Sequence, residues 1–317
     1  MYEILDPALK ILVIGDLMID HYIYGSCDRI SPEAPIPVVE IKSEMHTLGG
    51  AGNVLKNLKA LGCSTTIVSV TGNDENADLV ADLLGKDNID TDGLIKDAAR
   101  CTTIKSRVLA VRHQLIRLDR EVLTPISKEM EDAIIKKFAG IVNNFDIVLI
   151  SDYNKGLLTD NLLVNIIQLC KEAGKKTLID PKGLNFSKYK NASLIKPNRK
   201  EAGLATGIAI KDEESLKQAC EKLREITDCD NIVVTLSEDG TAIYSNQKLT
   251  IIPTKAIDVI DVTGAGDTVL ASLGVALASG KSLYDACVFA NQAAAIVVSK
   301  VGSATATFAE INAKFYN

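Results

Sequence analysis

The sequence contains no tryptophan, and aromatic residues make up only 4% of its 317 residues. Aliphatic side chains must therefore fill the interior, as they do in sheets that helices cover on both faces. Hydrophobic residues account for 47% and charged residues for 24%, which is typical of a globular protein with a large core. These proportions favour an α/β fold.

Other absences exclude whole classes of protein. None of the seven cysteines forms a C-x-x-C pair, so the sequence indicates neither a zinc site nor a disulfide framework. The formal net charge of -6 argues against a general affinity for nucleic acids. No apolar run approaches the ~18 residues of a membrane span, and the N-terminus does not resemble a signal peptide. We therefore expect a cytoplasmic protein that binds neither nucleic acid nor membrane.

Short β-branched runs alternate with longer helical patterns along the chain. This alternation predicts a doubly wound, mainly parallel sheet flanked by helices. The predicted strands are residues 11–15, 65–70, 146–150, 176–179, 194–196 and 232–235. The predicted helices are residues 51–61, 76–84, 128–143, 161–173, 213–227, 267–279 and 284–299.

Two stretches interrupt the alternation and predict a small β lid beside the main sheet. Residues 22–42 contain three prolines, and residues 101–119 resemble a hairpin with strands at 102–108 and 114–119. We expect a single domain over residues 1–317 that includes both lid segments. A small sheet leaves an apolar face and open edges, so we also expect a homodimer in which the lids pair.

A glycine-rich run, residues 261–268 (DVTGAGDT), is the strongest candidate for a catalytic centre. Gly264 and Gly266 allow a sharp turn before an apolar segment that predicts a helix. The free amides and the positive dipole end of such a helix stabilise an anion, including a phosphoryl group in transfer. Asp267 stands where a general base would be needed. The alternative interpretation is an N-cap aspartate on a buried helix.

Two further groups of residues lie at predicted strand-to-helix or strand-to-loop junctions. Gly49 and Gly50 precede a helix that contains Asn53, and their bare backbone would let a ligand approach; a simple tight turn is the alternative. Asp16 and Asp20 follow the strand 11–15, at the end where open α/β sheets bind ligands, and carboxylates suit sugar hydroxyls. Their alternative role is to cap a turn.

Asn198 and Glu201 lie three residues apart at the start of another predicted helix. On one helix face they could hold a hydrated Mg²⁺ beside nucleotide phosphates. Asn at the N-cap with Glu at the third helical position also matches a capping box. Their spacing alone does not separate the two interpretations.

In order and spacing, these motifs resemble the ribokinase (PfkB-type carbohydrate kinase) family over essentially the whole chain. Within that family, four strings resemble the heptose 7-phosphate kinases of lipopolysaccharide synthesis: residues 29–38, 114–119, 151–156 and 180–183. The glycine turn at residues 49–53 is one residue shorter than in ribokinases proper, which argues against ribose. The resemblance therefore implies phosphorylation of D-glycero-β-D-manno-heptose 7-phosphate at C1.

The same resemblance implies roles for individual residues, with ATP and Mg²⁺ as cofactors and room for a monovalent cation. Asp267 would be the base, and the anion hole would comprise Gly264, Ala265 and Gly266. The ATP and Mg²⁺ site would include Asn198, Arg199, Lys200 and Glu201, with Asn291 near the adenine. The sugar would contact Asp16, Asp20, Gly49, Gly50, Asn53 and Lys182. Candidates for the sugar phosphate are Arg107, Arg112, Arg117, Lys155 and Lys182, for which solvated surface charge is the alternative.

Two alternatives to a heptose kinase remain open. One is another sugar or sugar-phosphate kinase of the same family, and another is a non-catalytic sugar-phosphate sensor on the same scaffold. A Rossmann dehydrogenase is disfavoured, because no G-x-G-x-x-G follows the first strand.

The nucleotidyltransferase domain that is fused to this kinase in many bacteria has an H-x-G-H motif that this sequence lacks. We therefore expect a stand-alone kinase or an excised kinase domain.

Overall fold

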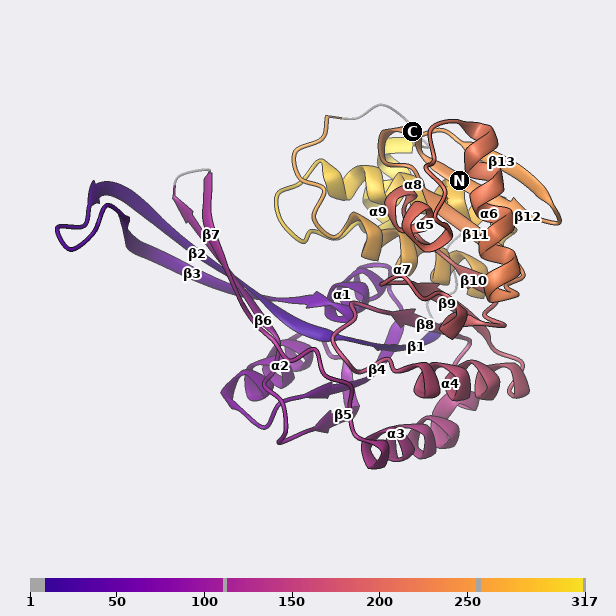
Figure 1. The fold of residues 1–317 in the computed structure, drawn as a ribbon, viewed down its shortest axis with the longest axis horizontal. Helices are drawn as coiled ribbons and strands as arrows, with labels where there is room; N and C mark the ends of the chain where they lie inside the picture. Colours follow the sequence, from indigo (N-terminus) through magenta and orange to yellow (C-terminus); the bar gives the residue numbers. More distant parts are fainter. Residues whose placement is uncertain (1–8, 111–112, 255–257, 316–317) are drawn as a thin grey trace.

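The computed structural model describes residues 9–110, 113–254 and 258–315. Its largest element is a nine-stranded sheet with the order β13-β12-β11-β10-β9-β8-β1-β4-β5 (Figure 1). Pairing is parallel from β11 to β5 and antiparallel for β12 and β13. The strands are β1 (Lys10–Gly15), β4 (Ser64–Thr71), β5 (Asp90–Lys96), β8 (Ile147–Ser151), β9 (Lys176–Asp180), β10 (Leu194–Ile195), β11 (Asn231–Thr235), β12 (Thr241–Ser245) and β13 (Lys248–Ile252). The predicted, mainly parallel sheet is confirmed.

Helices cover both faces of this sheet and create two separate cores. Side chains alternate along β1, so Ile11 and Val13 join one core while Leu12 and Ile14 join the other. The first core is completed by α1 (Ala51–Ala60), α2 (Glu75–Lys86), α7 (Ala265–Ala278), α8 (Leu283–Val298) and α9 (Phe308–Phe315). The second is completed by α3 (Lys128–Ile141), α4 (Asp160–Glu172), α5 (Arg199–Thr206) and α6 (Glu213–Thr227). No helix within the described ranges is long and apolar enough to cross a membrane.

A second, four-stranded sheet forms the predicted lid, with the order β3-β2-β6-β7. Its strands are β2 (Leu17–Ile30), β3 (Pro37–Gly50), β6 (Ile104–Ala110) and β7 (His113–Arg120). Figure 1 shows β2 and β3 as a long ribbon that leaves the body of the molecule beside α1. This ribbon is longer at both ends than the expected segment 22–42, because β2 begins directly after β1 with the buried residues Leu17, Met18 and Ile19.

The order of the strands places a ligand crevice beside β1. From β1 the chain adds β4 and β5 on one side and later adds β8, β9 and β10 on the other. Such a switch in direction opens a crevice at the carboxyl ends of the two central strands. Asp16 follows β1 there, and Asp152 follows β8.

Candidate active site

The carboxylate of Asp267 lies at the N-terminus of α7 and is held on both oxygens. Asn53 Nδ2 donates to Oδ2 at 2.8 Å, and the Tyr153 hydroxyl donates to Oδ1 at 2.8 Å. The side chain is almost fully buried, with 4% of its surface exposed. Gly264 is the N-cap of the helix, and no side chain in the described part of the chain caps it. Asp267 is therefore not the capping aspartate of the alternative interpretation.

The turn before α7 requires glycine at position 264. Gly264 has a φ of 78°, in the left-handed region, and a Cβ there would lie 2.4 Å from Asn53 Nδ2. In the first turn of α7 the Ala265 N–H donates to the Val262 carbonyl at 3.2 Å. The amides that follow, of Gly266 and Asp267, belong to the first turn of a helix, where N–H groups lack partners within the helix. This end of α7 can therefore bind an anion.

A buried ion pair lies next to Gly266. Lys196 Nζ is 3.0 Å from Asp180 Oδ1, and a Cβ on Gly266 would lie 3.7 Å from Lys196 Nζ. Burial, together with the charges of Glu201 and Asp267, raises the pKa of Asp180 to about 7 against the opposing effect of Lys196. Burial also raises the pKa of Asp267, while hydrogen bonds from Asn53 and Tyr153 lower it. Carboxylates thus outnumber ammonium groups around the helix end, which suits an added cation.

Asp16 is occupied in holding the loop that carries Tyr153. Its Oδ2 accepts the backbone N–H groups of Tyr153 at 2.8 Å and Lys155 at 3.2 Å. Burial, and then the charge of Asp152, raise the pKa of Asp16 to about 6. These contacts agree with the alternative interpretation, in which Asp16 caps a turn. The structure thereby links the end of β1 to the loop after β8.

Asp20 lies on the lid strand β2, close to the glycine turn. Arg107 Nη1 on β6 is 2.5 Å from Asp20 Oδ1, and the guanidinium lies 5.4 Å from the Tyr22 ring centroid. A Cβ on Gly49 would lie 2.3 Å from Asp20 Oδ2, so glycine is needed for this approach. Gly50 is left-handed, with a φ of 58°. The predicted sugar-side residues Asp20, Gly49 and Gly50 are thus brought together, and Arg107 joins them.

The other cations considered for a sugar phosphate have different neighbours. Three of them pair with carboxylates other than Asp20: Arg117 with Asp119 at 2.8 Å, Lys155 with Glu121 at 2.8 Å, and Lys182 with Glu201 at 2.5 Å. Arg112 lies outside the described residues. Lys182, which was expected to contact the sugar, is therefore placed with the residues expected at the nucleotide.

Asn198 and Glu201 form the capping box that the sequence left open. Asn198 Oδ1 accepts the Glu201 N–H at 2.8 Å, and Glu201 Oε2 accepts the Asn198 N–H at 3.0 Å. Arg199 pairs with Asp239 at 2.5 Å, and Lys200 is exposed. Among the residues that the structure describes, each Glu201 oxygen has one partner, so the carboxylate keeps lone pairs that can accept a metal-bound water.

Asn291 on α8 borders a separate small cavity of about 50 Å³. Its Oδ1 accepts the Thr241 hydroxyl at 2.5 Å, and its Nδ2 donates to the Ile252 carbonyl at 3.3 Å. Apolar side chains and amides line the cavity: Ile252, Pro253, Val288, Asn291, Gln292, Ala295 and Phe315. A flat, partly polar ring would find suitable contacts there.

Three residues of the site were not among the candidates from the sequence. Tyr153 follows β8, Asp180 ends β9 and Lys196 follows β10, so all three stand at the carboxyl ends of neighbouring parallel strands. Their common position could have identified them from the sequence, because ligands bind at the carboxyl ends of strands in open α/β sheets. The contacts with Asp267 and Gly266 depend on strand order, which the motifs did not reveal.

The fold is that of sugar kinases. The Arabidopsis thaliana ribokinase complexed with ribose and ATP has a TM-score of 0.76 at 22% identity, covering 97% of this chain and 99% of that chain. The Escherichia coli phosphofructokinase-2 in complex with potassium has a TM-score of 0.79 at 17% identity, covering 96% of this chain and 97% of that chain. At these identities the similarity establishes the ribokinase-like fold alone.

Sequence comparison identifies the family. Residues 8–309 match the model of the pfkB family carbohydrate kinases, and the chain therefore belongs to this family. It is 49% identical over 311 residues to the Bifunctional protein HldE of Helicobacter hepaticus, covering 98% of this chain and 64% of that protein. It is 50% identical over 303 residues to the Bifunctional protein HldE of Campylobacter curvus, covering 96% of this chain and 64% of that protein. The chain thus spans 64% of the length of each of these relatives.

Proposed function

We propose that this chain transfers the γ-phosphoryl group of ATP to the C1 hydroxyl of D-glycero-β-D-manno-heptose 7-phosphate, which yields the 1,7-bisphosphate and ADP. The observation that carries the proposal is the buried Asp267 carboxylate at the N-terminus of α7, held by Asn53 and Tyr153. The identity of about half to the HldE relatives and the four strings that resemble heptose kinases support this sugar.

In the proposed reaction Asp267 acts as the general base. Its carboxylate accepts the proton of the C1 hydroxyl, while the sugar oxygen forms a bond to the γ-phosphorus and the bond to the β-phosphate oxygen breaks. Asn53 and Tyr153 fix the carboxylate in one orientation, so no reorganisation is needed during the transfer. The amides at the start of α7 stabilise the charge on the phosphoryl oxygens.

The oxygen donors of Asp180 and Glu201 fit Mg²⁺. Asp180 and Glu201 are hard oxygen donors. Burial, and then the charges of Glu201 and Asp267, raise the pKa of Asp180, and a cation would stabilise its ionised form. We assign the ion to Glu201 and Asp180 through water, with Asn198 holding Glu201 in place through the capping box. When bound, Mg²⁺ neutralises charge on the phosphates of ATP. A monovalent cation is compatible with this assignment.

The remaining substrate contacts follow from the charges at each end of the site. We assign the heptose hydroxyls to Asp20 and the glycine turn, and the 7-phosphate to Arg107, which is half-buried and lies beside Asp20. Lys182 pairs with Glu201, so we assign it to the phosphates of ATP. The cavity beside Asn291 is the proposed place of the adenine.

We also propose that two copies of the chain pair through their lid sheets. Ile116 and Leu118 on β7 are 51% and 54% exposed. Their register partners on β6, Val108 and Ser106, lie on the same face of the lid. Covering this face in a dimer removes the apolar surface from water. Light scattering at micromolar concentration should give the mass of a dimer, and a monomer mass would contradict it.

The test of the proposed function is a ³¹P NMR product assay with a panel of sugars. The chain is incubated with ATP, Mg²⁺ and either heptose 7-phosphate, fructose 6-phosphate, ribose or adenosine. We expect a new anomeric phosphate signal with heptose 7-phosphate and the highest kcat/KM for that sugar. A higher kcat/KM for another sugar would refute the heptose assignment and keep the kinase; no ADP with any sugar would contradict the kinase itself.

A further inference from the structure

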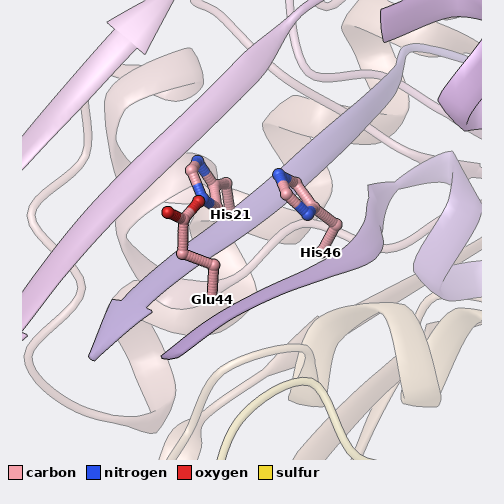
Figure 2. A group of neighbouring side chains, drawn as sticks. All are labelled: His21, Glu44 and His46. Carbon is pink, nitrogen blue, oxygen red and sulfur yellow. The ribbon is translucent and has the colours of Figure 1, made fainter. Parts of the chain in front are cut away.

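A pair of stacked histidines lies on the lid, where β2 and β3 leave the body of the molecule. The register of the two strands sets His21 directly opposite His46. The ring centroids are 4.1 Å apart, and the ring planes differ by 15°. Glu44 lies two residues before His46 and therefore on the same face of β3. Figure 2 shows the three side chains gathered on one side of the strands.

This cluster lies on the opposite face of the lid from the proposed sugar site. Side chains alternate along β2, so Asp20 and His21 point to opposite faces. Asp20 contacts Arg107 on β6, whereas His21 contacts Ser106, the residue that precedes Arg107 on the same strand. A ligand bound at His21 is therefore separate from the Mg²⁺ assigned above to Asp180 and Glu201.

We propose that His21, Glu44 and His46 form a binding site for a divalent transition-metal ion such as Zn²⁺. One ligand atom from each residue lies within 4.8 Å of those of the other two. Two imidazoles and one carboxylate are a donor set that Zn²⁺ accepts at about 2.0–2.2 Å. A tetrahedral ion spaces its ligand atoms by roughly 3.4 Å, so modest side-chain rotations complete the geometry.

Ser106 supplies the outer contact that a metal-binding histidine needs. Its Oγ lies 3.0 Å from His21 Nδ1. Ligating histidines commonly donate the second ring N–H to an acceptor, which fixes the tautomer and directs the other nitrogen to the metal. When the His21 Nδ1–H donates to Ser106 Oγ, Nε2 directs its lone pair toward Glu44 Oε2, 2.8 Å away. The metal binds Nε2 through its lone pair and takes the place of any proton between these two atoms, which would pass to solvent.

The three ligands come from two long strands of the lid, and this arrangement gives the ion a structural role. A metal bound to His21 on β2 and to Glu44 and His46 on β3 links the two strands where the ribbon leaves the body. The His21 side chain is 13% exposed and the Glu44 side chain 45%. In a single copy of the chain the ion can therefore enter from solvent, and its fourth position is open to water. The cluster shares the lid face of Ser106, which the proposed dimer covers.

The experiment titrates metal into the full chain, prepared without a polyhistidine tag and stripped of metal with a chelator. Zn²⁺ is followed by calorimetry and Co²⁺ by visible absorption. We expect one ion per chain, with d–d bands of a low-coordinate ion. His46→Gln and Glu44→Gln should each weaken Zn²⁺ binding more than ~10-fold, and Ser106→Ala by ~10–100-fold. His113→Gln, an exposed histidine on β7, is the matched control and should bind as the wild type does.

Three results would overturn the site: no stoichiometric binding to the wild type, equal affinity of His46→Gln and His113→Gln, or an intense thiolate charge-transfer band with Co²⁺. The last would place the ion on half-buried Cys27 or Cys101. Circular dichroism of the metal-free variants checks their fold. Because Glu44 is exposed, Glu44→Gln decides the question should His46→Gln fail to fold.

Discussion

The hydroxyl of Tyr153 donates a hydrogen bond of 2.8 Å to Asp267 Oδ1, and this bond joins the loop after β8 to the first turn of α7. The two residues are 114 positions apart in the chain. Together with the bond from Asn53 to the opposite oxygen, this contact fixes the orientation of the carboxylate that we propose as the base.

Replacement of the base should abolish most of the catalysis and leave binding intact. For Asp267→Asn we expect kcat to fall by ~10²–10⁴, the usual contribution of a positioned base, because an amide cannot accept the sugar proton. The affinity for ATP, measured by calorimetry, should stay close to that of the wild type. Circular dichroism provides the control for folding. An unchanged kcat would remove Asp267 from this role.

Removal of the Tyr153 hydroxyl should shift the pH profile. The bond from Tyr153 lowers the pKa of Asp267 against the effect of burial. In Tyr153→Phe that pKa rises, so the acidic limb of kcat/KM moves to higher pH. A hydrogen bond to a charged group is worth about 1.5 kcal/mol, which corresponds to roughly one pH unit.

The matched control for Tyr153→Phe is Tyr244→Phe, at a buried tyrosine on β12. It removes the same atom from a position remote in the sheet order, and its acidic limb should coincide with that of the wild type. Should the limb of Tyr153→Phe also stay in place while kcat falls, the hydroxyl would act on the substrate rather than on Asp267.

Alanine variants at two glycines with left-handed backbone conformations distinguish the effect of backbone strain from damage to the site. Gly264 and Gly280 have φ values of 78° and 77°, so alanine at either position costs ~1 kcal/mol of stability or more. At Gly264 the new Cβ meets a side chain, Asn53 Nδ2 at 2.4 Å, whereas at Gly280 no atom of the described residues lies within 4 Å. Gly264→Ala should therefore displace Asn53 and lower kcat ~10²-fold.

Gly280→Ala should lose comparable stability in urea unfolding and keep the wild-type kcat. Equal activity of the two alanine variants would show that the position of Asn53 does not matter for the reaction. Unfolding curves for both variants are needed beside the kinetics, because the strain at the two glycines must be matched for the comparison to hold.

Structure was predicted most accurately from the sequence where a motif and the residues that it contacts lie close together in the chain. The turn at Gly264, the helix after it and the position of Asp267 depend on a few adjacent residues. Tyr153 and Lys196 reach the same place only through the strand order β10-β9-β8-β1, which no local pattern encodes. The β12–β13 hairpin was missed because Asn246 and Gln247 turn with positive φ values of 50° and 62° without a glycine to signal it.

The raised pKa of Asp16 predicts an unusual dependence of stability on pH. Its pKa is raised from 3.8 to about 6, so between these values the folded protein holds a proton that the unfolded chain has released. The contribution of Asp16 to the free energy of unfolding therefore decreases as pH rises from 4 to about 6. At 1.36 kcal/mol per unit, the loss amounts to ~3 kcal/mol at most.

Asp16→Asn removes this titration while its Oδ1 can still accept the Tyr153 N–H. Urea unfolding of both proteins from pH 4 to pH 7 should show the variant gaining up to ~3 kcal/mol relative to the wild type, whatever the constant offset between them. Asp82→Asn, on the exposed face of α2, is the surface control. A difference between variant and wild type that stays constant over this range would mean that Asp16 is already ionised at pH 4 in the folded protein.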